Sequence, residues 1–199
     1  MLRASADTID GVDALELPAG ELLLRPWRGG DAPAVWAALQ DPAIRLWNGA
    51  DASSPDDVAA MLARRADWSA GDHASFAVTF RGTVLGSVSL HSIDPAQADA
   101  EIGYWTAPAA RGRGIAVRAV VAVCGWAFPA LGLDRIELLH AVDNPASGRV
   151  AAKAGFTCEG RLRRSYRYGD GLKHDELLWS RLSDDPPLAG SPAGRPGRG

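Results

Sequence analysis

The feature that most constrains this chain is a glycine-rich turn at residues 111–116, Arg-Gly-Arg-Gly-Ile-Ala, between an extended run and a long apolar segment. Glycines let a backbone bend tightly and bring its N–H groups close to a ligand. A helix that begins at such a turn directs its free N–H groups and its positive dipole end at that ligand. Because two arginines add charge, the turn predicts a site for phosphate oxygens. A plain strand-to-helix corner is the alternative, and the local sequence leaves both open.

The composition indicates a single globular domain. The chain has 199 residues, 47% of them hydrophobic, which is enough to bury a substantial core. A net charge of −3 gives no sign of a nucleic-acid partner. Cys124 and Cys158 match no metal or disulfide pattern, so we expect free thiols in a reducing, cytoplasmic compartment. The histidines lack the spacing of metal ligands, so we expect no metal site and structural or exposed roles for His73, His91, His140 and His174.

One segment, residues 114–133, approaches the length of a membrane-spanning helix. It contains Arg118, Gly125 and Pro129, and polar sequence flanks it on both sides. These features favour a buried helix that covers a sheet. The first residues also lack the apolar run of a signal peptide, so we expect no membrane association.

The order of predicted elements is strand, two helices, three strands, helix, strand, helix and two strands. This order predicts a mixed α/β sheet of about seven strands with about four helices, whose first part is antiparallel. The folded domain is expected over residues 21–182, after an N-terminal extension at residues 1–20. Residues 183–199 are rich in Pro and Gly and are expected to form a disordered tail.

A second group of residues follows one strand after the glycine-rich turn. Asn144 stands where a helix cap belongs, and Pro145 stands at the first helical position. The helix continues through Ser147 and Lys153 to a stop at Gly155. Capping alone is a sufficient reason for Asn144, so a purely structural role remains open beside a functional one.

Taken together, these motifs resemble the GCN5-related N-acetyltransferase (GNAT) superfamily, and within it the RimJ/RimL-like ribosomal-protein N-acetyltransferases. The likeness covers about residues 20 to 182 and depends on the order of four motifs. The residues that match them are Leu22, Leu24, Arg25 and Pro26; Arg111, Gly114 and Ala116; Asn144, Ser147, Lys153, Gly155 and Phe156; and Gly171, Asp175 and Leu177. A dinucleotide-binding turn matches less well, because Val117 replaces its third glycine, and the P-loop Lys is absent.

The resemblance implies a GNAT fold and an acyl-CoA donor, acetyl-CoA or another such as succinyl-CoA. The turn would receive the diphosphate, and the pantetheine arm would lie along the strand that ends near Tyr104, much as an added peptide strand does. The residues expected to bind the donor are Tyr104, Trp105, Thr106, Arg111, Gly112, Arg113, Gly114, Ile115, Ala116, Asn144, Ser147 and Lys153. The implied activity is N-acyltransfer to a primary amine. A non-catalytic module that binds acyl-CoA or a partner is the alternative.

Direct attack of an amine on a thioester requires a proton acceptor and a hydrogen bond for the departing thiolate. Glu101, on the strand before the turn, is the candidate base, with a solvent-facing strand residue as its alternative. Asp175 is a second candidate base or a substrate carboxylate, and pairing with an arginine of its own hairpin competes with that role. Many GNAT enzymes use a Tyr where this chain has Ala151, so the resemblance implies Ser147 as the thiolate partner.

The resemblance implies a small-molecule amine or a protein N-terminus, and a homodimer. Trp47 and Asn48, between the first two predicted helices, are expected to line the acceptor cleft.

Overall fold

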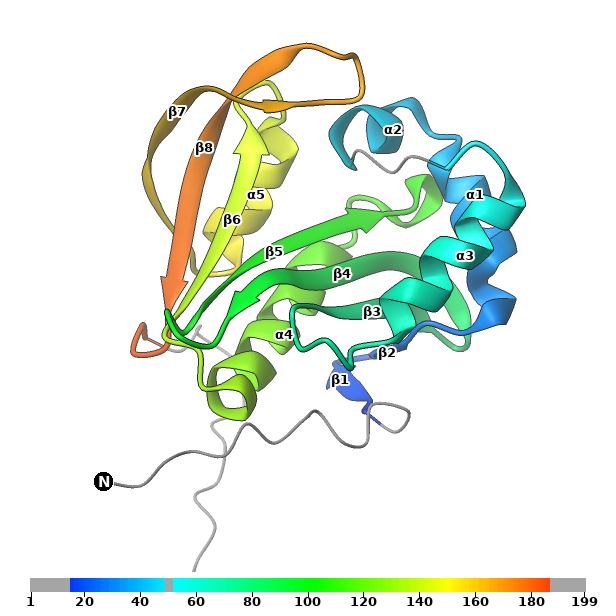
Figure 1. Cartoon of the computed structure of the whole chain (residues 1–199), viewed down its shortest axis with the longest axis horizontal. Helices are drawn as coiled ribbons and strands as arrows, with labels where there is room; N and C mark the ends of the chain where they lie inside the picture. Colours follow the sequence, from blue (N-terminus) through cyan, green and yellow to red (C-terminus); the bar gives the residue numbers. More distant parts are fainter. Residues whose placement is uncertain (1–14, 49–51, 187–199) are drawn as a thin grey trace, which may run out of the picture.

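The computed structural model describes residues 15–48 and 52–186, which form one eight-stranded sheet with helices on both faces (Figure 1). The strands are ordered β1-β2-β3-β4-β5-β6-β8-β7. Their bounds are β1 Leu17–Ala19, β2 Leu22–Pro26, β3 Ala74–Phe80, β4 Thr83–Asp94, β5 Asp99–Thr106, β6 Arg135–Ala141, β7 Thr157–Arg167 and β8 Lys173–Leu182. The α-helices are α1 Ala32–Leu39, α2 Pro42–Asn48, α3 Pro55–Ala66, α4 Ile115–Leu131 and α5 Pro145–Lys153.

The functional geometry depends on the pairing of β5 with β6, the parallel neighbours in an otherwise antiparallel sheet. Their ladder runs from Asp99 opposite Arg135 to Glu101 opposite Glu137. Beyond Glu101 the two strands diverge, although β5 continues to Thr106 and β6 to Ala141 (Figure 1). The divergence leaves a fork in the middle of the sheet, with unpaired strand edges on both of its sides.

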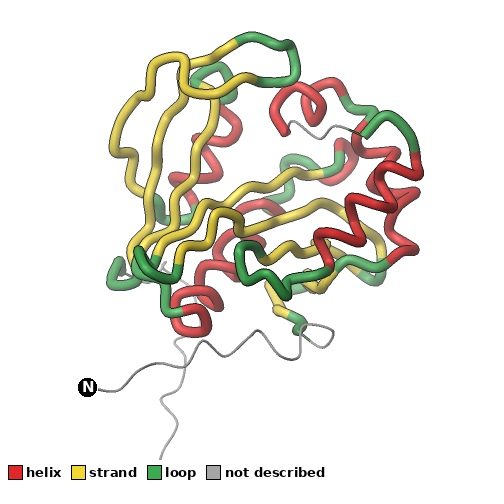
Figure 2. Tube along the Cα trace, in the orientation of Figure 1, coloured by secondary structure: helices red, strands yellow, loops and turns green. Residues whose placement is uncertain are grey.

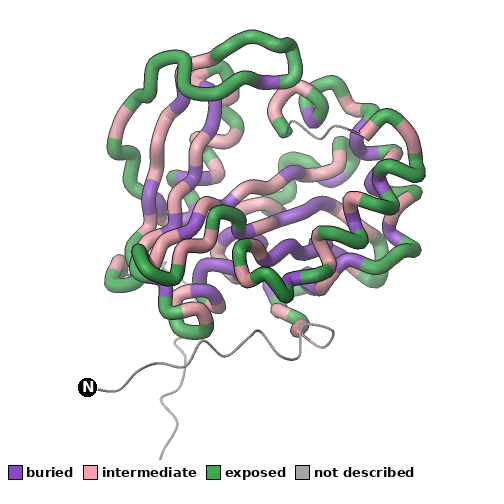
Figure 3. Tube along the Cα trace, in the orientation of Figure 1, coloured by how far each residue is buried: buried purple, intermediate pink, exposed green. Residues whose placement is uncertain are grey.

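Helices lie on both faces of the sheet (Figure 2), and each face is covered by its own hydrophobic cluster. On one face, α4 packs over side chains such as Val88 and Ile102, while on the other α1 and α3 pack over Ala77 and Trp105. Because successive side chains of a strand alternate between faces, Ile102 and Tyr104 lie on the α4 face, and Glu101 and Trp105 lie on the α1/α3 face. Figure 3 shows the buried positions concentrated in the central strands, with β7 largely exposed at the edge.

The predicted mixed sheet is confirmed, with one short strand and one short helix more than expected. The extra strand, β1, pairs with β2 and lies in the stretch assigned to the N-terminal extension. The extra helix, α2, replaces the connection expected around Trp47. It forms because Asp41 Oδ1 accepts a hydrogen bond from Ile44 N at 3.0 Å while Pro42 opens the helix. Of the predicted terminal segments, residues 1–14 and 187–199 lie outside the described residues.

No helix of the described residues is long and apolar enough to span a membrane. The segment around residues 114–133 forms α4, which buries Ala119, Val120, Val123 and Cys124 against the sheet. The long apolar run is therefore explained by core packing.

Candidate active site

A cleft of about 650 Å³ occupies the fork between β5 and β6. The first turn of α4 and the outer face of α5 form its walls, and α2 lies across its mouth. Apart from Arg113, every residue that the sequence predicts for donor binding lines this cleft, and so do Trp47 and Asn48. Glu101 and Asp175 are not among its lining residues. Two motifs distant in the sequence thus meet in one cavity.

The glycine-rich turn leaves the start of α4 open toward the cleft. Gly112 has a φ of +75° and Gly114 a φ of +69°, which is the left-handed region that L side chains rarely adopt. Gly114 is the N-cap of α4, and no side chain caps this helix within the described residues. Its first backbone N–H groups therefore remain available to an anion, and the helix dipole adds partial positive charge.

Both arginines of the turn were expected to bind the donor, but only Arg111 lines the cleft. Arg111 donates to both carboxylate oxygens of Asp41, at 2.6 and 3.2 Å, and to the Thr106 carbonyl at 3.3 Å. The Arg111 guanidinium lowers the pKa of Asp41 and ties the turn to the start of α2. Arg113 is exposed and lies outside the cleft lining. An anion bound at this wall would therefore contact mainly backbone N–H groups.

Basic side chains enter the cleft from the opposite wall. Lys153 lines it as predicted, and so does Arg149, which the sequence analysis missed. Arg149 precedes Lys153 by four positions on α5, and residues spaced in this way share a helix face. That spacing was the available signal.

A pair of hydroxyl groups joins the two sides of the fork. The Tyr104 hydroxyl on β5 lies 2.7 Å from Ser147 Oγ on α5, and both residues line the cleft. Burial raises the pKa of Tyr104 to about 12, so its hydroxyl stays protonated at neutral pH. Asn144 caps α5, because its Oδ1 accepts the Ser147 N–H at 3.4 Å. Asn144 thereby places Ser147 in the first turn of α5, facing Tyr104.

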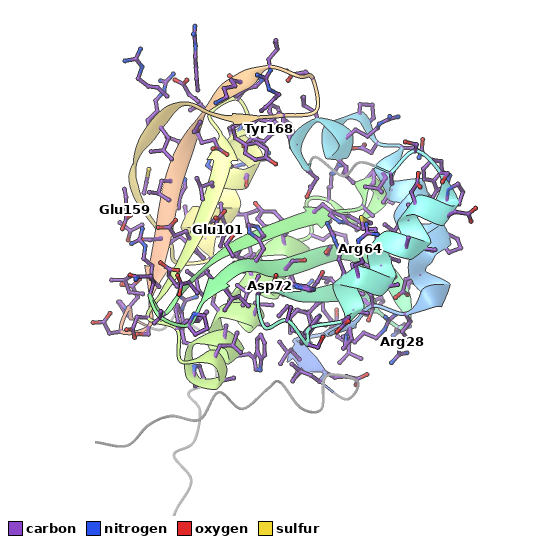
Figure 4. All side chains as sticks on the ribbon, viewed as in Figure 1. Arg28, Arg64, Asp72, Glu101, Glu159 and Tyr168 are labelled. Carbon is purple, nitrogen blue, oxygen red and sulfur yellow. The ribbon has the colours of Figure 1, made fainter. Side chains whose placement is uncertain are left out.

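Glu101, labelled in Figure 4, lies at the closed end of the fork. Because successive side chains of a strand alternate, it lies on the face opposite the Tyr104 side chain. Its side chain is 42% exposed, and its carboxylate lies 3.8 Å from His91 Nδ1 on the neighbouring strand β4. Its partner across the parallel ladder, Glu137, is bound by Arg135 at 2.7 Å. Glu101 thus combines an accessible carboxylate with a position next to the cleft.

Asp175 has the contacts of a structural residue. Arg161 donates to its carboxylate at 2.8 Å, and the backbone N–H of Arg164 donates to the other oxygen at 2.8 Å. These bonds hold Arg164, which has a φ of +47°, in an irregular part of the β7–β8 ladder. They lower the pKa of Asp175. The pairing with a hairpin arginine is therefore present, and catalytic and substrate-binding roles for Asp175 gain no support from the geometry.

The mouth of the cleft is aromatic. Trp47 on α2 makes edge-on contacts with Tyr168 and His174 of the β7–β8 hairpin, with ring centroids 5.3 and 5.8 Å apart. Tyr168, labelled in Figure 4, also lines the cleft. Asn48 donates from Nδ2 to the Tyr104 carbonyl at 3.4 Å. Helix α2 therefore bridges β5 and the hairpin above the fork.

The comparisons with known proteins agree with this geometry. The sequence pattern of the acetyltransferase (GNAT) domain matches residues 21–157, and the chain belongs to this family. The resemblance seen in the sequence is thus confirmed.

The chain is also similar to individual N-acetyltransferases. The chain is 29% identical to an uncharacterized N-acetyltransferase, YoaA of Bacillus subtilis, over 82% of this chain and 94% of the relative. It is 34% identical to a ribosomal-protein-serine acetyltransferase of Escherichia coli, over 51% of this chain and 56% of the relative. Several curated relatives are matched over only about half of their length, 56%. The structure of Mycobacterium smegmatis RimJ in complex with CoA-disulfide has a TM-score of 0.77 and 29% identity, covering 88% of both chains.

Proposed function

We propose that this protein is an N-acyltransferase that moves the acetyl group of acetyl-CoA to a primary amine. The observation that carries the proposal is the cleft at the fork of the sheet, which the uncapped start of α4 faces. Membership of the GNAT family and the likeness to a RimJ structure that holds a CoA derivative support the same donor class. A longer acyl-CoA such as succinyl-CoA is the variant that donor screening addresses.

The donor would enter the cleft with its phosphates at the turn. Backbone N–H groups from residues 111–116 would bind the diphosphate, with Arg149 and Lys153 supplying charge from α5. The pantetheine amides would pair with the free edge of β5 around Tyr104, because that edge has no strand partner beyond Glu101. This direction places the thioester toward the closed end of the fork.

The two faces of the sheet separate the two proton transfers of the reaction. The amine would attack from the α1/α3 face, where Glu101 lies, and the thiolate would leave toward the face where Ser147 lies. The Ser147 hydroxyl would donate to the departing sulfur, because Tyr104 holds that hydroxyl in the cleft. Backbone N–H groups of β5 near Tyr104 would stabilise the oxyanion.

The acceptor is proposed to be a protein N-terminus, with small amines as the second class. The name of the Escherichia coli relative, a ribosomal-protein-serine acetyltransferase, supports a protein acceptor. The free thiols of Cys124 and Cys158 support a reducing, cytoplasmic location. A homodimer is proposed from the resemblance alone.

The experiment combines donor binding with a screen of acceptors. Acetyl-CoA is titrated into the protein by calorimetry, and thiol release is then followed with unblocked peptides beginning with Ser or Ala and with spermidine. Binding and thiol release with at least one amine are expected. Tight binding without release for any amine would favour the acyl-CoA-binding module, and absence of binding at millimolar donor would contradict both.

A further inference from the structure

A histidine that the sequence analysis treated as structural or exposed lies next to the candidate base. His91 on β4 is the register partner of Glu101 on β5, and both side chains project from the α1/α3 face of the sheet. They lie at the level where β5 and β6 begin to part. This is the face from which the amine would approach, because Tyr104 and Ser147 occupy the other one.

The two ring nitrogens of His91 face different surroundings. Nδ1 lies 3.8 Å from a carboxylate oxygen of Glu101. Nε2 lies over Gly103, where an added Cβ would come within 3.4 Å of it. Gly103 lines the cleft, and its missing side chain leaves room for the imidazole over β5. One nitrogen thus lies near a carboxylate and the other lies over a glycine that lines the cleft, as in a base oriented by an acidic partner.

We propose that His91 Nε2 accepts the proton from the attacking amine and that Glu101 orients and supports the imidazole through Nδ1. This inference rests on the proposed function and changes the assignment of its base. Glu101 becomes a positioning residue, and His91 becomes the catalytic residue on the amine side.

These groups account for each proton transfer in the reaction. The neutral amine attacks the thioester carbonyl, the C–N bond forms, and the nitrogen's surplus proton passes to His91 Nε2. The C–S bond then breaks, and the thiolate receives a proton from the Ser147 hydroxyl. Solvent restores the Ser147 proton and removes the one on His91, leaving an amide and free CoA thiol.

The charge state of His91 suits this role. Partial burial lowers the pKa of His91 below its usual 6.5, and Arg65 on α3 acts in the same direction, while Glu101 on β5 opposes them. The imidazole is therefore neutral at pH 7 and has a lone pair to accept a proton. The rate is expected to rise with pH through a pKa below 6.5 and then to level off unless the amine itself titrates.

The kinetic test compares His91→Gln, Glu101→Gln and the double variant, with acetyl-CoA saturating and a Ser-initiated peptide or spermidine as acceptor. His91→Gln is expected to lower kcat about 100-fold or more without changing the KM for acetyl-CoA. The fall in rate at acidic pH, which is the acid limb of the pH–rate profile, is expected to disappear in this variant. Glu101→Gln is expected to cost less and to shift that limb to lower pH, because it removes the group that raises the pKa of His91. The double variant is expected to be no worse than His91→Gln.

The matched control is His73→Gln, which removes another histidine at the same end of the sheet and is expected to leave kcat unchanged. A loss of less than threefold in His91→Gln, with the acid limb retained, would overturn the proposal alone. Absence of turnover by the wild-type protein with every acceptor would overturn the proposed function as well, so the two failures are distinguishable.

A second measurement does not depend on turnover. Nitrogen-15 NMR of the imidazole in the acetyl-CoA complex is expected to show the neutral ring with its proton on Nδ1 and a bare Nε2. The pKa of His91 is expected to fall in Glu101→Gln. A proton on Nε2, or a pKa indifferent to this substitution, would overturn the proposal even if the His91 variants lose activity through misfolding.

Discussion

At the residue scale, the Tyr104–Ser147 hydrogen bond gives a prediction about the leaving group. Ser147→Ala is expected to lower kcat about 10- to 100-fold, because the thiolate loses its proton donor. Tyr104→Phe removes only the partner of Ser147 and is expected to cost about 1 kcal/mol, roughly a fivefold loss. Steady-state kinetics of both single variants and the double variant test this, since hydroxyls acting together lose less than the product of their separate effects. Fully multiplicative losses would contradict the coupling.

A second residue, His174, makes the stability of the hairpin depend on pH. Its ring contacts Asp143 at 3.0 Å and Asp170 at 2.8 Å, and these two carboxylates raise the pKa of His174 above 6.5. Because the pKa is higher in the folded state, the stabilisation is fully present below pH 6.5 and is lost as the pH rises through the raised value. Melting temperatures of the wild type and His174→Gln are therefore expected to differ most at pH 5.5 to 6 and to come closer together as the pH rises above 6.5. A constant difference across this range would contradict the charge contribution.

At the scale of elements, alanine substitutions at two glycines of α4 are expected to change stability in opposite directions. Gly114 has a positive φ and open space around it, so Gly114→Ala is expected to cost about 1 to 2 kcal/mol of stability through backbone strain alone. The same substitution displaces the N–H groups of the first turn and is expected to weaken acetyl-CoA binding. The control is Gly125→Ala, at an exposed position in the middle of the same helix. This substitution is expected to stabilise the protein by about 0.5 to 1 kcal/mol. Chemical unfolding and calorimetry measure both effects, and equal donor affinities in the two variants would exclude the turn as the anion site.

The elements that were predicted correctly are those whose sequence patterns are local. The glycine-rich turn and the Asn144 cap each depend on a few adjacent residues, and each forms where expected. Helix α2 was missed because it is short and its start depends on Asp41. Its seven residues give too weak a periodicity to show a helix.

At the scale of the whole molecule, the site depends on contacts that no local pattern encodes. Tyr104 and Ser147 are 43 positions apart and meet only because β5 and β6 diverge and α5 packs beside them. The His91–Glu101 pair follows from the register of β4 on β5, which a sequence without coordinates leaves undetermined. The sequence could therefore predict the candidate donor site, whose proposed anion ligands are mainly backbone groups of one turn, better than the arrangement of the candidate proton-transfer groups.

The contact between the β7–β8 hairpin and α2, across the mouth of the cleft, gives a prediction for the whole molecule. The β7–β8 hairpin reaches across to α2, and Gly169 N donates to the Leu46 carbonyl at 3.0 Å (Figure 1). A Cβ at Gly169 would lie 2.2 Å from the Arg45 carbonyl oxygen, so Gly169→Ala forces α2 and the hairpin apart. Such overpacking is expected to cost about 1 to 3 kcal/mol, to speed amide exchange at Gly169, and to raise the KM for the acceptor more than that for acetyl-CoA.

The hairpin supplies its own control in Gly160→Ala, where an added Cβ meets no atom within 4 Å. This variant is expected to keep the wild-type melting temperature and both KM values. Because the two substitutions add the same methyl group to the same hairpin, a difference between them reports the contact with α2. If Gly169→Ala raised only the KM for acetyl-CoA, helix α2 would close over the donor, and the acceptor would have to enter from the open face of the fork beside Glu101.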